Sequence, residues 1–264
     1  MKILDINNLT IKSKLENKNI IDKINFSLEK SKITCIVGES GSGKTITSRS
    51  IIKMLPKDIE ISSGNIMFKG ENLLILSEER IRKIRGKEIF TIFQNSINCF
   101  NPSLTMENQI YNMISSHFSV DKGCIRKKLI DIMEKINLNN PESILKQYPF
   151  QLSGGMLQRM MIAVSIIIKP DLLIADEPTT ALDLKSQKEI LKQFKIINEK
   201  FKTTILMITH DFAVVDEIAE DVIVMKNGKL IEKGKKEKIF NNPQEEYTKK
   251  LMKATFKREV ISTC

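Results

Sequence analysis

The stretch with the clearest chemistry runs from Gly38 to Thr45 and reads GESGSGKT. Its three glycines let the backbone curl tightly, so that successive N–H groups can point at one anion. Lys44 and Thr45 close the run. This spacing fits the phosphate-binding pattern G-x-x-x-x-G-K-[ST], whose lysine meets the β- and γ-phosphates of a nucleotide and whose hydroxyl meets Mg²⁺. A Gly-rich structural turn would leave the lysine and the threonine unexplained.

Two adjacent carboxylates form a second candidate site. The apolar run from Leu172 ends in Asp176, and Glu177 follows directly. A buried strand that ends this way can direct Asp176 towards a Mg²⁺ ion, while Glu177 reaches the water that attacks the γ-phosphate. An isolated Asp-Glu pair is more often a solvated turn after a strand, but the phosphate loop in the same chain favours the catalytic interpretation.

A third group opens an apolar helix. The run LSGGMLQR places Ser153, Gly154 and Gly155 before the apolar residues that continue to Ile168. Ser153 is expected to cap the helix, and the free N–H groups with the helix dipole predict a second anion site. Taken alone, these residues would be no more than an ordinary helix start.

Two further polar side chains stand at the ends of expected strands. Gln94 ends the apolar run 89–93, and His210 follows the run 204–209, directly before Asp211. A lone histidine is usually structural or solvent-facing, but a position after a parallel strand favours a functional role. His117 has no comparable context and no role is assigned to it.

Apolar periodicity predicts the elements that must position these groups, in an α/β arrangement. The expected strands are 3–11, 20–28, 33–37, 66–69, 89–93, 172–176, 204–209, 221–225 and 229–232. The expected helices are 46–55, 81–85, 125–136, 155–168 and 185–201, with a helical tail from 243. Residues 3–11 and 20–28 read as an antiparallel pair, and the later strand-helix-strand alternation predicts a parallel sheet.

Composition indicates an ordinary globular protein, with 41% hydrophobic and 28% charged residues among 264. The net charge of +10 reflects abundant lysine, without a compact basic block interleaved with aromatics, so nucleic acid is not an expected partner. The four cysteines lie far apart, which favours neither a zinc site nor disulfides and suits a reducing cytoplasm. No secretory signal is expected at the N-terminus, and no apolar run approaches the roughly 20 residues of a membrane span. Membrane association is therefore expected through a partner.

The order of these groups resembles the ATP-binding cassette (ABC) ATPases: phosphate loop, glutamine-ending strand, LSGG signature, carboxylate strand and histidine strand. The resemblance covers roughly residues 3–252. It implies a P-loop NTPase fold with a RecA-like parallel-sheet core, an N-terminal antiparallel β subdomain and an inserted helical subdomain. The ATPase domain is expected at 1–242, with the helical subdomain at about 97–168 and a C-terminal helical tail at 243–264.

The resemblance also implies roles for single residues. ATP binding is expected from Gly38, Glu39, Ser40, Gly41, Ser42, Gly43, Lys44 and Thr45, which match the Walker A loop. The expected catalytic residues are Glu177 as general base, His210 as switch histidine and Gln94 of the Q-loop. The expected Mg²⁺ contacts are Thr45, Gln94 and Asp176. Ser153, Gly154 and Gly155 match the signature that closes over a partner's ATP, and Ala181-Leu182-Asp183 resembles the D-loop.

Some segments indicate which branch of the ABC ATPases the chain resembles. Residues 92–94, 101–105, 176–183 and 247–251 look like the peptide/nickel importer branch, and 155–163 is particularly similar to nickel and metallophore import ATPases. The chain departs from the family by lacking an aromatic residue before Phe26 that could stack on adenine, and by carrying Met156 where many signatures have glutamine. Asn95 and Ser96 stand where peptide-importing relatives usually have an acidic residue and proline. The stop at Cys264, without the cysteine cluster of those relatives, is taken to favour metal import.

The function expected from this resemblance is ATP hydrolysis, with ATP and Mg²⁺, that energises a bacterial importer of nickel or another transition metal, free or as a chelate. Its expected partners are a second ABC ATPase subunit, either a paralogue or a second copy of this chain, two transmembrane permeases, and an extracellular solute-binding protein that acts through them. The chain is expected as a peripheral protein at the cytoplasmic face of the cell membrane. Import of di- or oligopeptides, a soluble non-transport cassette ATPase and a non-hydrolysing regulatory subunit remain as alternatives.

Overall fold

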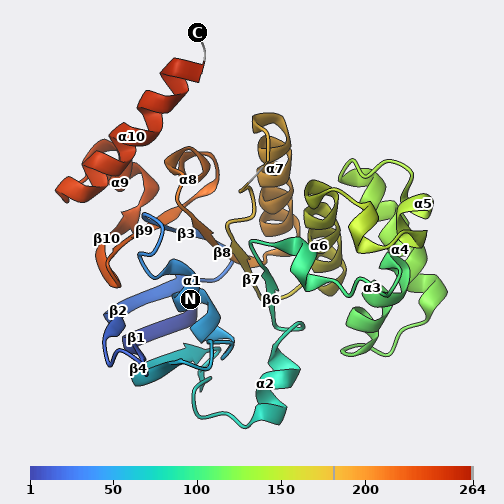
Figure 1. Ribbon diagram of the computed structural model, residues 1–264, viewed down its shortest axis with the longest axis horizontal. Helices are drawn as coiled ribbons and strands as arrows, with labels where there is room; N and C mark the ends of the chain where they lie inside the picture. Colours follow the sequence, from blue (N-terminus) through green and yellow to red (C-terminus); the bar gives the residue numbers. More distant parts are fainter. Residues whose placement is uncertain (181, 263–264) are drawn as a thin grey trace. The chain divides into compact units, whose positions relative to one another are not determined.

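The computed structural model of the protein describes residues 1–180 and 182–262 (Figure 1). The chain forms two compact units. The first unit contains Met1–Ile81 and the chain from Thr204 onward, and the second contains Arg82–Thr203. Each unit carries its own part of the residues singled out above, so the two are described in turn.

The first unit contains an antiparallel sheet in the order β2-β1-β4-β5. Its strands are β1 (Lys2–Ser13), β2 (Asn19–Glu29), β4 (Ile59–Phe68) and β5 (Glu71–Asn72). The antiparallel pairing of β1 with β2, for example Ile6 opposite Phe26, confirms the prediction for 3–11 and 20–28. Strand β4 begins seven residues before the expected start at 66 because it passes through Gly64 instead of beginning after it. With φ at 100°, a Cβ at Gly64 would lie 2.6 Å from the Asn8 carbonyl oxygen, so only glycine fits opposite this bulge in β1.

The same unit contains a mainly parallel group of strands, β3 (Ile33–Val37), β8 (Thr204–Thr209), β9 (Asp221–Lys226) and β10 (Lys229–Lys235). Strand β3 pairs in parallel with both β8 and β9. Every residue of β3 and β8 is buried, as expected for parallel strands covered on both faces. Strands β9 and β10 form the predicted hairpin around Asn227 and Gly228, which both have positive φ as a type I′ turn requires.

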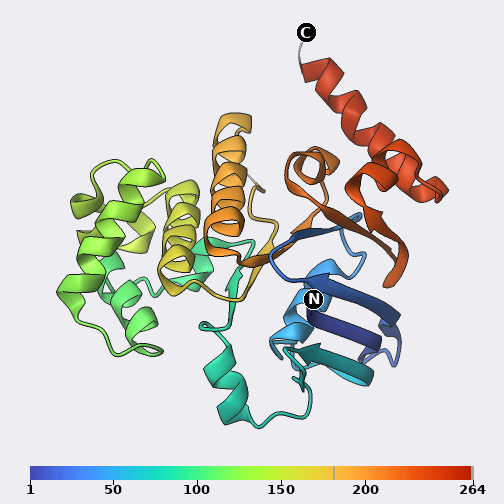
Figure 2. The same ribbon diagram turned by 180° about the vertical axis from the view of Figure 1, so that it is seen from behind.

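Four helices accompany these strands, α1 (Lys44–Ile51), α8 (Phe212–Ile218), α9 (Lys236–Asn241) and α10 (Glu246–Ser262). Helix α1 ends at Ile51, four residues before the expected end, because Lys53 takes a positive φ that closes the helix. Helices α8 and α9 are too short for a clear periodic signal and were not expected. In both views of the ribbon, α9 and α10 lie beside β9 and β10 (Figures 1 and 2).

The second unit is mostly helical around one parallel pair of strands, β6 (Ile89–Ile92) and β7 (Leu172–Asp176). Its helices are α3 (Met106–Ser115), α4 (Lys122–Lys135), α5 (Pro141–Lys146), α6 (Gly154–Ile168) and α7 (Leu184–Phe201), with 3₁₀ turns η1 (Ser96–Cys99) and η2 (Pro149–Gln151). Helix α2 (Glu78–Ile84) leads into this unit and begins three residues before the expected basic helix. Helix α6 is apolar nearly all round, and its Met160 and Met161 are buried, so these methionines pack in the core.

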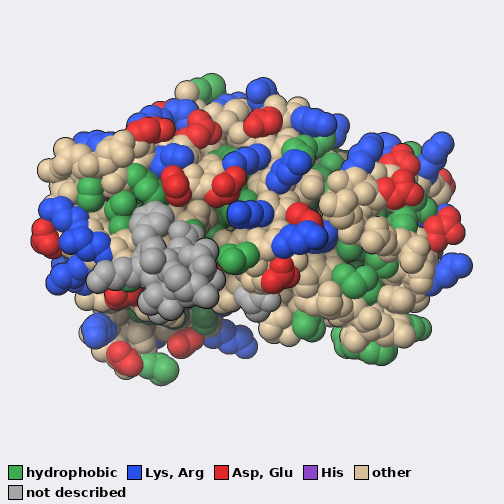
Figure 3. All heavy atoms as spheres, turned by 90° about the horizontal axis from the view of Figure 1, so that it is seen from above, with side chains coloured by type: hydrophobic (Ala, Val, Ile, Leu, Met, Phe, Trp, Pro, Cys, Tyr) green, Lys and Arg blue, Asp and Glu red, His purple; other side chains and the backbone are tan. Residues whose placement is uncertain are grey.

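The surface carries both signs of charge. On the face drawn in Figure 3, Lys and Arg side chains are interspersed with Asp and Glu and do not gather into one basic patch. Within the described residues, the helices are all too short or too polar to span a bilayer.

Candidate functional site

In the first unit, the run 38–43 connects the end of β3 to the start of α1, the strand-loop-helix context that a phosphate loop requires. Gly43 precedes α1 with φ at 101°, a backbone conformation that glycine adopts without strain. The first N–H groups of α1 have no partner within the helix, so with the helix dipole they favour an anion at this end. The loop geometry therefore suits phosphate oxygens.

Lys44 is the buried cation of this loop, with only 4% of its surface exposed. Its ammonium group donates hydrogen bonds to the carbonyl oxygens of Gly38 at 2.7 Å and Glu39 at 2.8 Å. These bonds fold the side chain back over the loop. A phosphate bound in the loop would meet a positive charge that is already held in place.

His210 also belongs to the first unit and directly follows β8, with its side chain exposed. Hydrogen bonds fix the backbone after it: the Asp211 N–H donates to the Thr209 hydroxyl at 3.1 Å, and the Asp211 carboxylate caps α8 by accepting from the Ala213 N–H at 2.9 Å. The sequence context that favoured a functional histidine is thus present.

In the second unit, Glu177 follows β7 and contacts two donors. The Gln94 side-chain amide donates to Glu177 Oε2 at 2.8 Å, and the Thr180 hydroxyl donates to the same oxygen at 2.9 Å. Glu177 has φ at 48°, a left-handed conformation that costs a non-glycine residue roughly 1–2 kcal/mol. Two polar residues predicted from separate strand ends therefore meet, and the strained backbone at Glu177 is typical of a functional position.

Asp176 and Thr45 are oxygen donors of the kind that Mg²⁺ prefers, as is the side-chain carbonyl of Gln94. Asp176 ends β7 with 2% of its surface exposed, and a buried carboxylate in this position is suited to a cation. Among the described residues, no group of three or more His, Cys, Asp or Glu side chains could hold a metal ion by itself. The donor chemistry fits Mg²⁺ held together with phosphate oxygens better than a metal site built wholly from protein side chains.

The signature residues lie at the start of α6. Ser153 caps the helix as predicted, because its hydroxyl accepts a hydrogen bond from the Met156 N–H at 3.2 Å. Ser153 and Gly154 are exposed, and a Cβ placed on Gly154 would meet nothing within 4 Å. The start of α6 is thus exposed, with open space beside Gly154.

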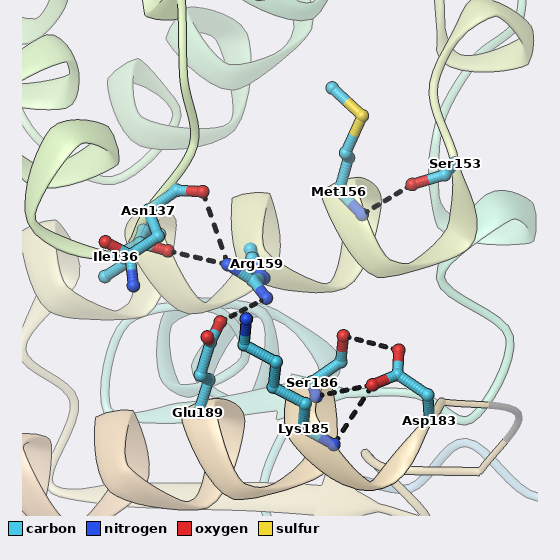
Figure 4. A network of polar contacts seen from close by, with 9 residues as sticks. All are labelled: Ile136, Asn137, Ser153, Met156, Arg159, Asp183, Lys185, Ser186 and Glu189. Atoms are coloured by element: carbon cyan, nitrogen blue, oxygen red, sulfur yellow. Dashed lines mark hydrogen bonds and ion pairs between the residues drawn. The ribbon is translucent and has the colours of Figure 1, made fainter.

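Two turns further along α6, Arg159 ties three helices of the second unit together (Figure 4). Its guanidinium donates to the carbonyls of Ile136 and Asn137, just beyond α4, at 3.2 and 3.3 Å. It also forms an ion pair with Glu189 of α7 at 2.7 Å. The arginine side chain is 15% exposed. This clamp fixes the signature helix against α4 and α7.

Asp183 begins α7 and caps it, accepting from the N–H groups of Lys185 and Ser186 at 3.0 Å each and from the Ser186 hydroxyl at 2.7 Å. The hydrogen bonds from Ser186 hold the pKa of the Asp183 carboxyl below its usual range. The predicted D-loop aspartate therefore acts here as a helix cap. Ala181 of the same motif lies outside the described residues.

One polar contact of this region was missed from the sequence. The Ser96 hydroxyl, in η1 two residues after Gln94, donates to the side-chain carbonyl of Gln158 in α6. Both residues are buried, and within the described residues the Gln158 amide nitrogen has no hydrogen-bond partner. The sequence signal for this contact was Ser96, which stands where peptide-importing relatives usually have proline. It marked the position as unusual but did not indicate Gln158 as the partner.

Comparisons with known proteins agree with this geometry. The pattern of the ABC transporter family matches residues 21–180. Over 252 residues the chain is 42% identical to the "Metal-staphylopine import system ATP-binding protein CntD" of Staphylococcus aureus (strain NCTC 8325 / PS 47), covering 96% of this chain and 93% of that protein. It is 41% identical over 254 residues to the "Dipeptide transport ATP-binding protein DppD" of Bacillus subtilis (strain 168), covering 95% and 76%. The solved dimer of the ATP-binding cassette MJ0796 in a post-hydrolysis state with ADP and Pi matches with a TM-score of 0.79 and 25% identity, over 88% of this chain and 98% of that one.

Fold and site together define a P-loop ATPase of the cassette type, with an antiparallel β subdomain and a parallel-sheet core. The chain belongs to the ABC transporter family. Within that family it is an ATPase subunit of an importer, which binds and hydrolyses ATP.

Proposed function

We propose that this ATPase energises the import of nickel or another transition metal, taken up free or as a chelate. The observation that carries the proposal is the 42% identity with a metal-staphylopine import ATPase along nearly the whole of both chains. The similarity of residues 155–163 to metal-import subunits supports it. The cargo would cross through the permeases.

In this proposal each of the predicted site residues has its own role in ATP hydrolysis. The phosphate loop with Lys44 neutralises the ATP phosphates. Thr45, Gln94 and Asp176 would hold Mg²⁺, which would add charge neutralisation at the phosphate oxygens. Glu177 orients and deprotonates the attacking water, and His210 stabilises the γ-phosphate. The hydrogen bonds that the Gln94 amide and the Thr180 hydroxyl donate to Glu177 Oε2 would orient this carboxylate for that step.

The partners follow from the same family. A second ATPase subunit, a paralogue or another copy of this chain, would receive Ser153, Gly154 and Gly155 over its ATP. Two permeases would anchor the pair at the cytoplasmic face of the membrane, and an extracellular solute-binding protein would deliver the cargo to them. Gln94 and the helices that follow it would pass closure of the ATPase pair to the permeases.

Di- or oligopeptide import is the second candidate, because identity with the Bacillus subtilis dipeptide transport ATPase is 41%. A strain lacking this subunit separates the two. We expect its cellular nickel, cobalt or zinc content, measured by inductively coupled plasma mass spectrometry, to fall while uptake of labelled di- and oligopeptides is kept. Complementation with the wild-type chain should restore the metal, and complementation with Lys44→Ala should not. Unchanged metal content with lost peptide uptake would overturn the proposed cargo.

A further inference from the structure

The C-terminal part of the first unit holds the phosphate loop from outside, at three places. The Gly228 N–H, in the turn between β9 and β10, donates to the Ser42 carbonyl at 3.0 Å. Gly38 lies so close to β9 that a Cβ on it would approach the Met225 carbonyl oxygen to 2.2 Å. These two contacts are made by backbone, so they fix the loop's path without depending on side-chain chemistry.

The third contact comes from a side chain of α10. The Glu39 N–H, inside the phosphate loop, donates to the hydroxyl oxygen of Tyr247 at 3.1 Å. The Glu39 carboxylate also interacts with that hydroxyl, which can donate to it in return. Burial of the phenol and the nearby negative charge of Glu39 both raise the pKa of Tyr247, so the hydroxyl keeps its proton at neutral pH.

Tyr247 is itself held in place. The Lys226 ammonium lies over its ring, 4.6 Å from the centroid. The next residue, Thr248, is fully buried and donates to the Glu232 carboxylate at 2.6 Å. Glu232 also accepts from the N–H groups of Gln244 and Glu245, at 2.8 and 3.3 Å. Glu232 thus ties the start of α10 to β10, and the Tyr247 hydroxyl is delivered to the loop from an anchored helix.

The backbone N–H and carbonyl groups of Glu39 connect Tyr247 to the Lys44 ammonium. Its N–H is bound by Tyr247, while its carbonyl accepts from the Lys44 ammonium at 2.8 Å. A hydrogen-bonded chain therefore runs from α10 through one loop residue to Lys44. We propose that Tyr247 is a positioning residue for ATP binding: it fixes the Glu39 peptide, and thereby the loop and the Lys44 ammonium, in the conformation that receives the phosphates.

This inference rests on the proposed role of residues 38–45 in holding ATP. Its test uses the purified full-length chain and the fluorescent analogue mant-ATP, with unlabelled ATP as competitor. Tyr247→Phe removes only the hydroxyl and keeps the ring beneath Lys226. Loss of one such hydrogen bond should weaken nucleotide binding about threefold to tenfold. Lys249→Ala is the matched control: Lys249 lies on the same helix, forms an ion pair with exposed Glu246 and should not affect binding.

A second readout distinguishes positioning from a general loss of stability. Amide hydrogen exchange in the nucleotide-free chain should accelerate in peptides covering 38–45 of Tyr247→Phe, while peptides covering β8 keep their wild-type rates. Wild-type or tighter mant-ATP binding by Tyr247→Phe would overturn the inference. It would also be overturned if amide exchange became faster throughout the first unit, or if it did not become faster in the loop. Lys44→Ala separates the two proposals. If this variant binds mant-ATP normally, the proposed ATP site is wrong. If it loses mant-ATP binding while Tyr247→Phe binds normally, only the proposed role of Tyr247 is wrong.

Discussion

The phosphate loop of the first unit and the signature segment of the second are both glycine-rich starts of helices, but they are built differently. The loop buries its cation, since Lys44 is 4% exposed, and its backbone is held by β9, the β9–β10 turn and α10. The signature presents Ser153 and Gly154 to open space, and its anchoring contacts lie further along α6 at Gln158 and Arg159. A preformed loop with a buried cation suits a ligand that the chain binds alone. An exposed helix start on a rigid helix suits a ligand presented by another subunit.

The largest effect is expected from replacing the proposed general base, Glu177. Glu177→Gln keeps the size of the side chain but cannot accept a proton, so turnover in the assembled importer should fall at least about 100-fold. ATP binding by the isolated chain should be retained. Phosphate release and mant-ATP binding measure the two quantities, and a wild-type rate would contradict the assignment of Glu177 as the base.

Lys44→Ala tests the role of the buried cation in the loop. Removing a buried, charged donor should weaken ATP binding by roughly 10- to 100-fold, because hydrogen bonds to charged groups contribute about 1.5–3 kcal/mol. Titration of the purified chain with mant-ATP gives the affinity. Thr248→Val, which alters α10 without touching Lys44, should cost less. Equal losses in the two variants would mean that the lysine has no special role.

Arg159→Ala tests the anchoring of the signature helix. It removes a mostly buried cation that binds two carbonyls and Glu189, so the free energy of unfolding should fall by roughly 1–3 kcal/mol. Arg159→Lys should recover only part of this loss, since an ammonium cannot reproduce the planar fork of donors. Urea unfolding followed by circular dichroism measures both. Full stability in Arg159→Ala would show that the clamp does not hold α6.

The smallest effect is expected at the link between η1 and α6. Ser96→Ala leaves the buried Gln158 side chain without its hydroxyl donor and should cost about 1 kcal/mol of unfolding free energy. The double variant Ser96→Ala with Gln158→Met removes both polar partners and should regain stability relative to Ser96→Ala alone. A double variant less stable than both single ones would argue that Gln158 is held by other contacts.

Much of this structure was predictable because its signals are local. Glycine spacing and the following lysine identified the loop at 38–45, and alternation or apolar runs located β1, β2, β3, β7 and β8 closely. Element ends were less accurate where a single residue decides them, as Gly64 inside β4 and Lys53 after α1 show. Contacts between residues far apart in the chain could not be read from either partner. Tyr247 and Glu39 are 208 positions apart in the sequence, and Ser96 and Gln158 are 62 apart. Only the folded chain brings the two members of each pair into contact.

The most direct test of the contrast between loop and signature is Gly154→Asp. A side chain at this position meets open space, and aspartate in the first turn of a helix is favourable to it, so the fold should be kept. The new negative charge would face a partner's ATP but not the chain's own. We predict that the isolated variant binds mant-ATP with wild-type affinity while ATP hydrolysis by the assembled importer falls more than about tenfold. Loss of ATP binding by the isolated chain, or full activity in the complex, would contradict the account.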